Sequence, residues 1–472
     1  MIAIIEKVYQ FLWGDWIVLP LPGGSSFRLS LLVLILIPAG IWFTIRTRFL
    51  PIRLFPDMLH ALFEKKGKEE GESHNSTLSA LQTLIVSTAT RVGMGNLVGV
   101  VAAISAGGAG AVFWMWVTAL IGSSTAFVEA TLAQIYKEKD PVYGGYRGGP
   151  AYYMHRFIQE KRGGKKKRYV GISVLFAISG LICWCGISQV ISNSVTSAFH
   201  NAFHIPPIYT TVVLVALAAV IIFRKTATVK VLDVLVPVMA GCYFLITVIL
   251  ICMNFSALPG VFSKIFEEAF GIRQAVAGGL GTVVMNGVKR GLFSNEAGSG
   301  SAPCAAAAAE SDQPVKLGLT QALGVFIDTI VICSCTAMIM LLTPESLTEG
   351  AVGMELLQVA MGYHLGQFGV IFIAATLWLF SFSTFLGILY YARSNISYLF
   401  GDGMLPQNLY KVLALVMMFI GGLAAYTVVW DLGDVGVGLM TVFNIIMLYP
   451  MSGIAMKALK SYETEKKNRK KG

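Results

Sequence analysis

Charged residues are scarce in this sequence. Asp, Glu, Lys and Arg make up 13% of its 472 residues, whereas apolar residues make up 55%. An ordinary soluble domain carries about 25% charged residues, and a disordered chain has few apolar ones. The composition therefore excludes both classes and predicts a protein that crosses a membrane several times.

Cysteine and histidine are few and scattered. None of the seven cysteines forms a C-x-x-C pair, and all lie in or near apolar segments, where a thiol packs as a small apolar group. Of the six histidines, only His200 and His204 are one helical turn apart, and no acidic residue stands beside them. We therefore expect no disulfide framework, no zinc site, no cofactor and no enzymatic chemistry.

Long apolar segments dominate the chain, and we count eleven candidate membrane spans. The first is peripheral, and the other ten divide into two groups of five, at 78–252 and 272–456. Because five is odd, the two groups enter the membrane from opposite sides, as in inverted-repeat transporters. We predict an all-α polytopic fold with spans at 29–46, 78–104, 109–136, 170–200, 208–223, 231–252, 272–309, 317–342, 366–399, 409–429 and 434–456.

Positive charge is concentrated in three hydrophilic stretches, at 46–68, 137–168 and 457–471, whereas the stretch 343–365 has no Lys or Arg. With eleven spans, all three basic stretches lie on one side of the membrane. The positive-inside rule then places the N-terminus outside and the basic tail, 457–472, in the cytoplasm. Lipid headgroups, not nucleic acid, are the expected partners of these cations.

The segment before the first span is also apolar. Residues 2–21 lack a basic leader and a cleavage site of small residues, so we expect an interfacial helix rather than a signal peptide. This helix, the peripheral span and the basic loop after it form an N-terminal region, 1–77.

Two spans are interrupted by residues that break a membrane helix. The second of them contains the run LFSNEAGSGS at 292–301. Backbone groups released at bilayer depth cannot bond to lipid, so such breaks survive only where they line a cavity or are buried in protein. Two broken helices in corresponding halves predict the binding site of a secondary transporter. The break in the first contains Arg91, Gly93, Gly95, Asn96 and Gly99.

A short helix should begin near Asn96, after the first break. Free N–H groups of Met94, Gly95 and Asn96 at its positive end suit a small anion such as an amino-acid carboxylate. The alternative is a glycine kink that lets two helices pack closely through Gly95 and Gly99.

Four runs are more specific: RVGMGNLVGV at 91–100, GGAGAVFWMW at 107–116, YRGGPAYYM at 146–154 and GLFSNEAG at 291–298. Together they resemble the alanine/glycine:cation symporters, also called sodium:alanine symporters, over about residues 30–456. This resemblance implies the five-plus-five inverted repeat of the leucine-transporter fold. It also implies import of small neutral amino acids with a cation, usually sodium.

The resemblance further implies roles at the first break, because the stretch 93–96 is similar to the break of the leucine-transporter fold. The N–H groups of Met94 and Gly95 would hold the substrate carboxylate. One sodium ion, a hard cation that prefers oxygen, would bind the carbonyls of Ala89 and Val92 and hydroxyls on the ninth span. The hydroxyls are those of Ser383 and Thr384, whose alternative is a bond to the preceding helical turn.

Arg91 is unusual, because a lone Arg in hydrocarbon costs at least ~2.5–3.5 kcal/mol. It should face a cavity or pair with Glu129, Glu296 or Asp328, which form a candidate charge network. In the leucine-transporter fold that the resemblance implies, one of two sodium sites uses the backbone at this position. A fixed cation there would repel sodium, so we predict one sodium site and not two. The alternative is an ion pair that only joins two helices.

The second break should line the cavity from the other side. We expect Glu296 near the start of the half-helix that follows, where the helix dipole favours a carboxylate, with Phe293, Ser294 and Asn295 facing the substrate. Lys289 and Arg290, just before the break, need a wet cavity, an acidic partner or the interface.

Three further residues are candidates for the substrate cavity. Gln189 and Asn193 share one helical face, which either reaches the substrate or bonds to a neighbouring helix. Ile388 lies one turn beyond Thr384 and would set the size of the pocket.

The hypothesis is a sodium-coupled importer of alanine or glycine in the cell membrane, with sodium as the coupling ion. The first rival is a proton-coupled transporter of the same fold, with Glu296, Glu129 or Asp328 as the proton carrier, or a carrier of a larger neutral amino acid such as glutamine. The second rival is a transporter-like sensor that binds an amino acid without moving it. The expected partners are the amino acid, sodium and lipid, and the expected oligomeric state is a monomer.

Overall fold

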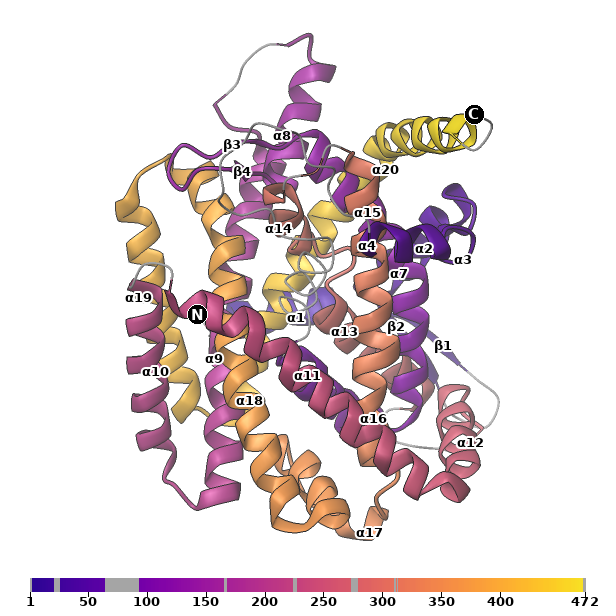
Figure 1. Cartoon of the computed structure of the whole chain (residues 1–472), viewed down its shortest axis with the longest axis vertical. Coiled ribbons are helices and arrows are strands. Elements are labelled where there is room, and N and C mark those ends of the chain that lie inside the picture. The colour runs from indigo at the N-terminus through magenta and orange to yellow at the C-terminus, as the bar shows by residue number, and fades with distance from the viewer. Residues whose placement is uncertain are drawn as a thin grey trace.

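The structure is a computed structural model that describes residues 2–20, 26–63, 93–164, 168–223, 227–272, 279–309, 311 and 313–469. Over these residues the chain forms a bundle of helices with two short hairpins (Figure 1), so the predicted all-α class is confirmed. The principal helices are α7 (Gly110–Ile135), α9 (Gly171–Phe203), α10 (Pro207–Phe223), α11 (Ala227–Met253), α13 (Gly279–Asn295), α15 (Pro314–Phe326), α18 (Met354–Phe400), α19 (Met404–Leu423) and α20 (Tyr426–Arg469).

Shorter elements connect and cover these helices. The hairpins pair β1 (Asp15–Pro20) with β2 (Ser26–Ser30) and β3 (Glu138–Lys139) with β4 (Tyr146–Arg147). Two segments, η1 (Gly95–Gly99) and η3 (Ile327–Cys333), are π-helices, and η2 (Phe255–Ala257) is a 3₁₀-helix. The short α-helices are α1 (Ile2–Trp13), α2 (Leu31–Arg46), α3 (Leu50–Arg53), α4 (Phe55–Phe63), α6 (Val100–Gly107), α8 (Pro150–Lys161), α12 (Leu258–Ala269), α14 (Ala302–Ala308), α16 (Ser334–Leu341) and α17 (Glu345–Thr348).

Among the residues described, six helices are long and apolar enough to cross a membrane. The end of α11, Val238–Met253, and the following helical segment, Phe255–Ala269, are together also long and apolar enough to cross a membrane, although the chain bends by 76° between them. Three apolar helices are shorter: α2, α10 and the continuous pair η1 and α6. The predicted number of eleven spans is therefore not established, and the first part of the span at 78–104 lies outside the described residues.

Helix α18 contains two helices joined at a break. Gly366 there has φ 61° and ψ −152°, a conformation that favours glycine. The part after Gly366 coincides with the span that the sequence predicts at 366–399.

The N-terminal helix ends earlier than the sequence predicts. A Cβ at Gly14 would lie 2.2 Å from the carbonyl oxygen of Gln10, so this exit from α1 requires glycine, and the chain continues into the β1–β2 hairpin. Trp13, the last residue of α1, is 2% exposed, and its indole N–H donates to the backbone oxygen of Asp434 at 3.0 Å. The helix therefore packs on α20.

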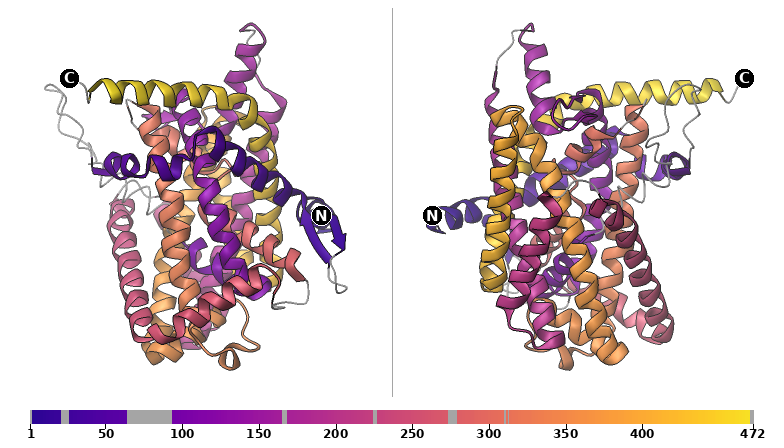
Figure 2. Two further views of the ribbon diagram at one scale, coloured as in Figure 1. Left: turned by 90° about the vertical axis from the view of Figure 1, so that its right-hand side faces the viewer. Right: turned by 60° about the vertical axis from the view of Figure 1, so that its left-hand side comes forward.

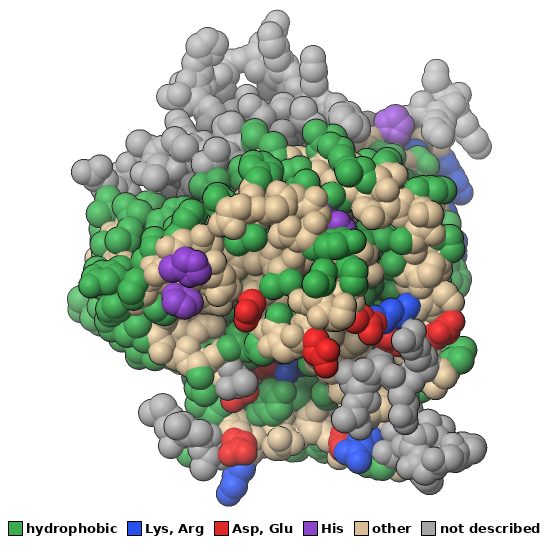
Figure 3. Space-filling model, turned by 90° about the horizontal axis from the view of Figure 1, so that it is seen from below, with side chains coloured by type: hydrophobic (Ala, Val, Ile, Leu, Met, Phe, Trp, Pro, Cys, Tyr) green, Lys and Arg blue, Asp and Glu red, His purple; other side chains and the backbone are tan. Residues whose placement is uncertain are grey.

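The described parts of the three basic stretches lie at one end of the bundle. In Figure 1, α8, the β3–β4 hairpin and the C-terminal end of α20 lie in the upper part, with α3 and α4 nearby, and α17 lies at the opposite end. Seen from that opposite end, acidic side chains border a hollowed area (Figure 3). This arrangement fits the predicted charge asymmetry.

Glycine allows the central helices to approach closely. α9 contacts α18, α19 and α20, and a Cβ on its Gly186 would lie 2.2 Å from the backbone nitrogen of Gly433 on α20. On the other side, α7 contacts α13 and α15. The two predicted breaks meet between these groups of helices.

Candidate substrate and ion site

The two predicted breaks lie against each other. The backbone bends at Gly93, and the π-helix η1 follows from Gly95, close to the expected start at Asn96. A Cβ on Gly95 would lie 3.4 Å from Cα of Ser294 and 3.6 Å from the carbonyl oxygen of Phe293, at the end of α13. Residues about 200 positions apart in the chain thus form one site.

Asn96 is the hub of this site and is fully buried. Its side-chain oxygen accepts the N–H of Gly93 at 2.9 Å, which holds the turn before η1. Its amide nitrogen donates to Oδ1 of Asp328 at 2.7 Å and to Oγ of Ser294 at 3.2 Å. One side chain therefore connects the first break, the second break and the π-helix η3.

Asp328 is the second centre of the network and is 1% exposed. Its Oδ2 accepts hydrogen bonds from Ser294 Oγ at 2.8 Å and from Thr329 Oγ1 at 3.0 Å. Asn295 donates to Thr329 at 3.2 Å. Ser294, Asn295 and Asp328 were all predicted from sequence, and the structure brings them together.

Two residues of this network were missed by the sequence reasoning. Thr336 on α16 donates to the backbone oxygen of Asn96 at 2.8 Å, and Cys333 Sγ lies 3.3 Å from the Asn96 amide nitrogen. The short polar residues between 328 and 336 were the available signal, because Asp328, Thr329 and Thr336 interrupt an otherwise apolar span.

The expected sodium ligands are partly described. The N–H of Met94 donates to Oγ1 of Thr384 on α18 at 3.1 Å, so two predicted residues 290 positions apart are in contact. Ser383 directly precedes Thr384, and both side chains are half-buried. Ala89, Arg91 and Val92 lie outside the described residues, so their predicted roles stay predictions.

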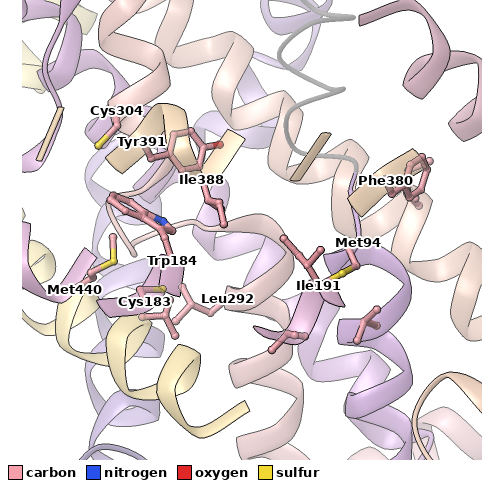
Figure 4. Close-up of a cluster of buried hydrophobic side chains, with 14 of the residues drawn as sticks. Met94, Cys183, Trp184, Ile191, Leu292, Cys304, Phe380, Ile388, Tyr391 and Met440 are labelled. Atoms are coloured by element: carbon pink, nitrogen blue, oxygen red, sulfur yellow. The ribbon is translucent and has the colours of Figure 1, made fainter. Parts of the chain in front are cut away.

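The large buried apolar cluster of the bundle includes Met94 of the first break and Ile388 of α18. Ile388 is 3% exposed and belongs to the same buried cluster as Leu292 of α13 and Trp184 of α9. Figure 4 shows these side chains converging from three helices, with Met94 beside Ile191 of α9. Ile388 lies one helical turn beyond Thr384 on α18, and the Thr384 hydroxyl accepts the N–H of Met94 at the first break.

Gln189 and Asn193 are placed differently. The Gln189 amide donates to the sulfur of Met417 at 3.2 Å, and the Asn193 amide donates to the carbonyl oxygens of Gly421 and Ala424 at 3.1 and 2.7 Å. Both amides therefore bond to α19 and the turn after it, which is the second of the two options that the sequence left open.

Glu129 organises the second break. Its Oε2 accepts the N–H of Gly298 at 3.0 Å, and its Oε1 accepts a hydrogen bond from the amide of Asn444 on α20. The same amide donates to the Gly298 carbonyl at 3.0 Å, and the hydroxyl of Tyr153 donates to Asn444. Glu129 thus holds backbone that the break releases, and neither Asn444 nor Tyr153 was anticipated.

Glu296 does not occupy the position that the sequence predicts. It directly follows α13, with φ 57°, and α14 begins only at Ala302. The break is this long because Gly298 and Gly300 also adopt positive φ, at 93° and 84°. The Glu296 carboxylate therefore lies at the C-terminal end of α13. The prediction that it stands near the start of the next half-helix, where the helix dipole would favour it, is wrong.

Lys289 and Arg290 have an acidic partner, Asp434 of α20. Lys289 Nζ lies 2.5 Å from Asp434 Oδ2, and Arg290 donates to both carboxylate oxygens at 3.0 and 3.2 Å. The guanidinium carbon of Arg290 is 3.9 Å from the ring centre of Trp430, and Trp430 packs edge-on against Phe293, centres 5.0 Å apart. We call these three charged residues the ion cluster.

A cavity of about 560 Å³ opens elsewhere, near α17. It is lined by residues of α6, α12, α16 and α17, including Lys264, Glu268 and Glu345, and by none of the predicted site residues. In the parts of the chain that the structure describes, no group of three His, Cys, Asp or Glu side chains could hold a metal ion. The oxygen-rich contact of two broken helices remains the candidate site.

Comparisons with known proteins identify the family of this chain. The model of the sodium:alanine symporter family matches residues 23–472. The amino-acid carrier protein AlsT of Bacillus subtilis is 41% identical, covering 94% of this chain and 91% of its own length. The probable sodium/glutamine symporter GlnT of the same organism is also 41% identical, covering 93% and 89%.

Among solved structures, a manganese transporter from Eremococcus coleocola superimposes with a TM-score of 0.51 at 11% identity, over 83% of this chain and 81% of that one. This likeness concerns the fold alone. The family match and the two relatives decide the class of protein. The chain belongs to the sodium:alanine symporter family, so it is a multi-pass membrane protein for amino-acid symport and not an enzyme.

Proposed function

We propose that this chain imports small neutral amino acids, alanine or glycine, together with sodium by alternating access. The observation that supports this most directly is the contact of the two breaks at Gly95 and Ser294, with the N–H of Met94 directed at Thr384. Backbone N–H groups at the start of a half-helix suit a carboxylate, and hydroxyl oxygens suit sodium. The proposed site has both kinds of group, because the N–H of Met94 and the hydroxyl of Thr384 lie 3.1 Å apart.

In this proposal the substrate carboxylate binds the N–H groups of Met94 and Gly95, beside Asn96. Sodium binds the carbonyls of Ala89 and Val92 with the hydroxyls of Ser383 and Thr384. The Met94–Thr384 hydrogen bond then opens when both ligands enter, since each of its two groups has a ligand of its own. The apolar wall at Ile388 and Leu292 limits the size of the side chain.

Two alternatives have support of their own. Glutamine is the first, because the glutamine-named relative is as similar to this chain as the amino-acid carrier is. Proton coupling is the second, because Glu129 and Asp328 are each 1% exposed and lie at the two breaks. We also propose that the basic end of the bundle is cytoplasmic, which places the N-terminus outside.

The experiment is uptake of radiolabelled alanine into proteoliposomes with an inward sodium gradient, and with choline in place of sodium. Sodium-dependent uptake that glycine inhibits supports the proposal. Uptake that follows an imposed pH step without sodium identifies proton coupling, and uptake of glutamine but not alanine identifies the larger substrate. Alanine binding without exchange of internal for external alanine identifies a sensor.

A further inference from the structure

A cluster of exposed cations lies away from the transport site, at one corner of the basic end. It combines Arg46, Arg48 and Arg53, around α3, with Lys457, Lys460 and Lys467 near the end of α20. We call these six residues the basic corner. In segments 42–61 and 451–468, seven Lys and Arg residues stand against three Asp and Glu residues, so the corner has a net positive charge.

Large apolar side chains are exposed between the arginines. Phe49 and Ile52 of the α2–α3 region are 55% and 77% exposed, and Ile45 is 58% exposed. The guanidinium carbon of Arg46 lies 5.6 Å from the ring centre of Trp42, which is itself 45% exposed. Alternation of exposed apolar and cationic side chains is typical of a segment at the boundary between acyl chains and phosphates.

Two distant parts of the chain form this surface together. Arg53 pairs with Glu463 at 2.6 Å, and Lys466 pairs with Asp57 of α4. α20 contains Pro450, a residue that can kink a helix. Figure 2 shows the last part of α20, in yellow, running across the end of the bundle above the indigo helices near the N-terminus. Two of the three carboxylates are thus used in internal ion pairs, while the six cations of the basic corner, except Arg53, have no carboxylate partner among the described residues.

The lysines of α20 share one face of the helix. Lys457, Lys460 and Lys467 are spaced by three and seven residues, and the residues on the opposite face, such as Met451, Ala455 and Leu459, are buried. The three ammonium groups therefore project from a fixed helix on the same side, as a site for several phosphates requires.

We propose that the basic corner binds anionic phospholipid headgroups of the adjacent leaflet in preference to zwitterionic ones. Arg and Lys donate to phosphate oxygens, and the exposed apolar side chains enter the acyl region. Each Lys or Arg near an anionic surface strengthens binding by about fivefold. Four or more such cations on a surface at the membrane are enough to select for anionic lipid.

Lipid bound here should stabilise the whole bundle. It would bridge α3 and α20, which are about 400 residues apart in the chain. α4 carries the effect inward, because it contacts α15 and its Phe55 packs against Phe326 with ring centres 5.7 Å apart. Phe326 directly precedes η3, which holds Asp328.

The test uses the purified full chain in detergent, with added phosphatidylglycerol or phosphatidylcholine, and measures the melting temperature by intrinsic fluorescence. We expect phosphatidylglycerol to raise the melting temperature at lower concentration than phosphatidylcholine does. In the triple variant K457Q/K460Q/K467Q, the phosphatidylglycerol concentration for half of this effect should rise at least about tenfold, since three cations are lost.

The matched control is K161Q/R162Q/R168Q, which removes three exposed cations from α8 and the loop after it, at the same end of the bundle. It should keep the wild-type response. A second variant, R46Q/R48Q, should weaken the response from the α3 side. Equal responses of the wild type to both lipids, or an equal loss in the control, would overturn the proposal. The readout does not depend on transport, so this outcome is distinct from failure of the proposed function.

Discussion

Arg290 and Asp434 form a two-point contact across 144 positions of sequence, with N–O distances of 3.0 and 3.2 Å. Lys289 shares the same carboxylate, and its ammonium also donates to the hydroxyl of Tyr9 on α1 at 2.7 Å. All three charged residues are at least nine-tenths buried. The ion cluster therefore joins the helix before the second break to α20 and to the N-terminal helix.

Replacing Asp434 by Asn should strongly destabilise the protein. The change leaves two buried cations without their counter-charge, and breaking a buried ion pair from one side costs about 3–5 kcal/mol. Thermal unfolding of the purified protein, followed by intrinsic fluorescence, measures the loss as a lower melting temperature.

The chain supplies a matched control in Asp15, which pairs with Arg28 at 2.9 Å with both side chains exposed. D15N makes the same chemical change in water, where an ion pair contributes about 0–1 kcal/mol. Similar melting temperatures for D434N and D15N would contradict a stabilising role for the ion cluster.

Exchanging the partners Asn96 and Asp328 tests the hub of the site. N96D places a second carboxylate 2.7 Å from that of Asp328. D328N removes the negative charge and one of the two acceptor oxygens that Asn96, Ser294 and Thr329 share, so each single variant should lose transport by about tenfold or more. The double variant N96D/D328N restores one donor and one acceptor. We expect it to recover part of the alanine uptake in proteoliposomes, as a double-mutant cycle detects.

A non-additive recovery is the decisive result of that cycle. If the fold-loss of alanine uptake in the double variant equals the product of the fold-losses in the two single variants, the two side chains do not act as a pair. Melting temperatures of all four proteins serve as the control, because a variant that is merely unfolded loses uptake and stability together.

Some features of the site could be predicted from sequence because they violate a rule of membrane helices. Glycines and Asn at bilayer depth located the first break, and the run at 292–301 located the second. Ser294 and Asn295 were identified with the second break, and Asp328 was identified as an acid in an apolar span. These residues are exceptions in their own segments, so no knowledge of the rest of the fold was needed.

Other features depend on tertiary contacts, which the pattern of one segment does not contain. The sequence shows that Lys289 and Arg290 need a wet cavity, an acidic partner or the interface. It does not point to Asp434, which stands at the start of a predicted span, where an acid is unremarkable. The π-helix η3 has the same apolar composition as an α-helix. The faces of Gln189 and Asn193 are defined only by where α19 packs, so periodicity could not choose between substrate and helix.

Thr384 offers a test of the sodium site. T384A removes the acceptor of the Met94 N–H and a proposed sodium ligand, whereas T384S keeps the hydroxyl. We expect T384A to raise the sodium concentration for half-maximal uptake by about tenfold, which corresponds to roughly 1.4 kcal/mol, and T384S to change it little. The measurement is alanine uptake as a function of external sodium. An unchanged sodium dependence in T384A would remove this hydroxyl from the site.

Ile388 tests the size of the substrate pocket. I388A removes three carbons from a side chain that is 3% exposed and belongs to the same buried cluster as Leu292 and Trp184, so the proposed pocket wall should move back. We expect glutamine to compete better with alanine uptake in this variant than in the wild type, by several-fold, since one methylene in an apolar pocket contributes about 1–3 kcal/mol. Loss of packing alone costs about 2–5 kcal/mol and would lower stability without changing selectivity. I265A, which truncates a fully buried Ile on α12 outside the site, separates the two effects. If both variants keep the wild-type ratio of glutamine to alanine inhibition, Ile388 is a packing residue and the pocket wall lies elsewhere.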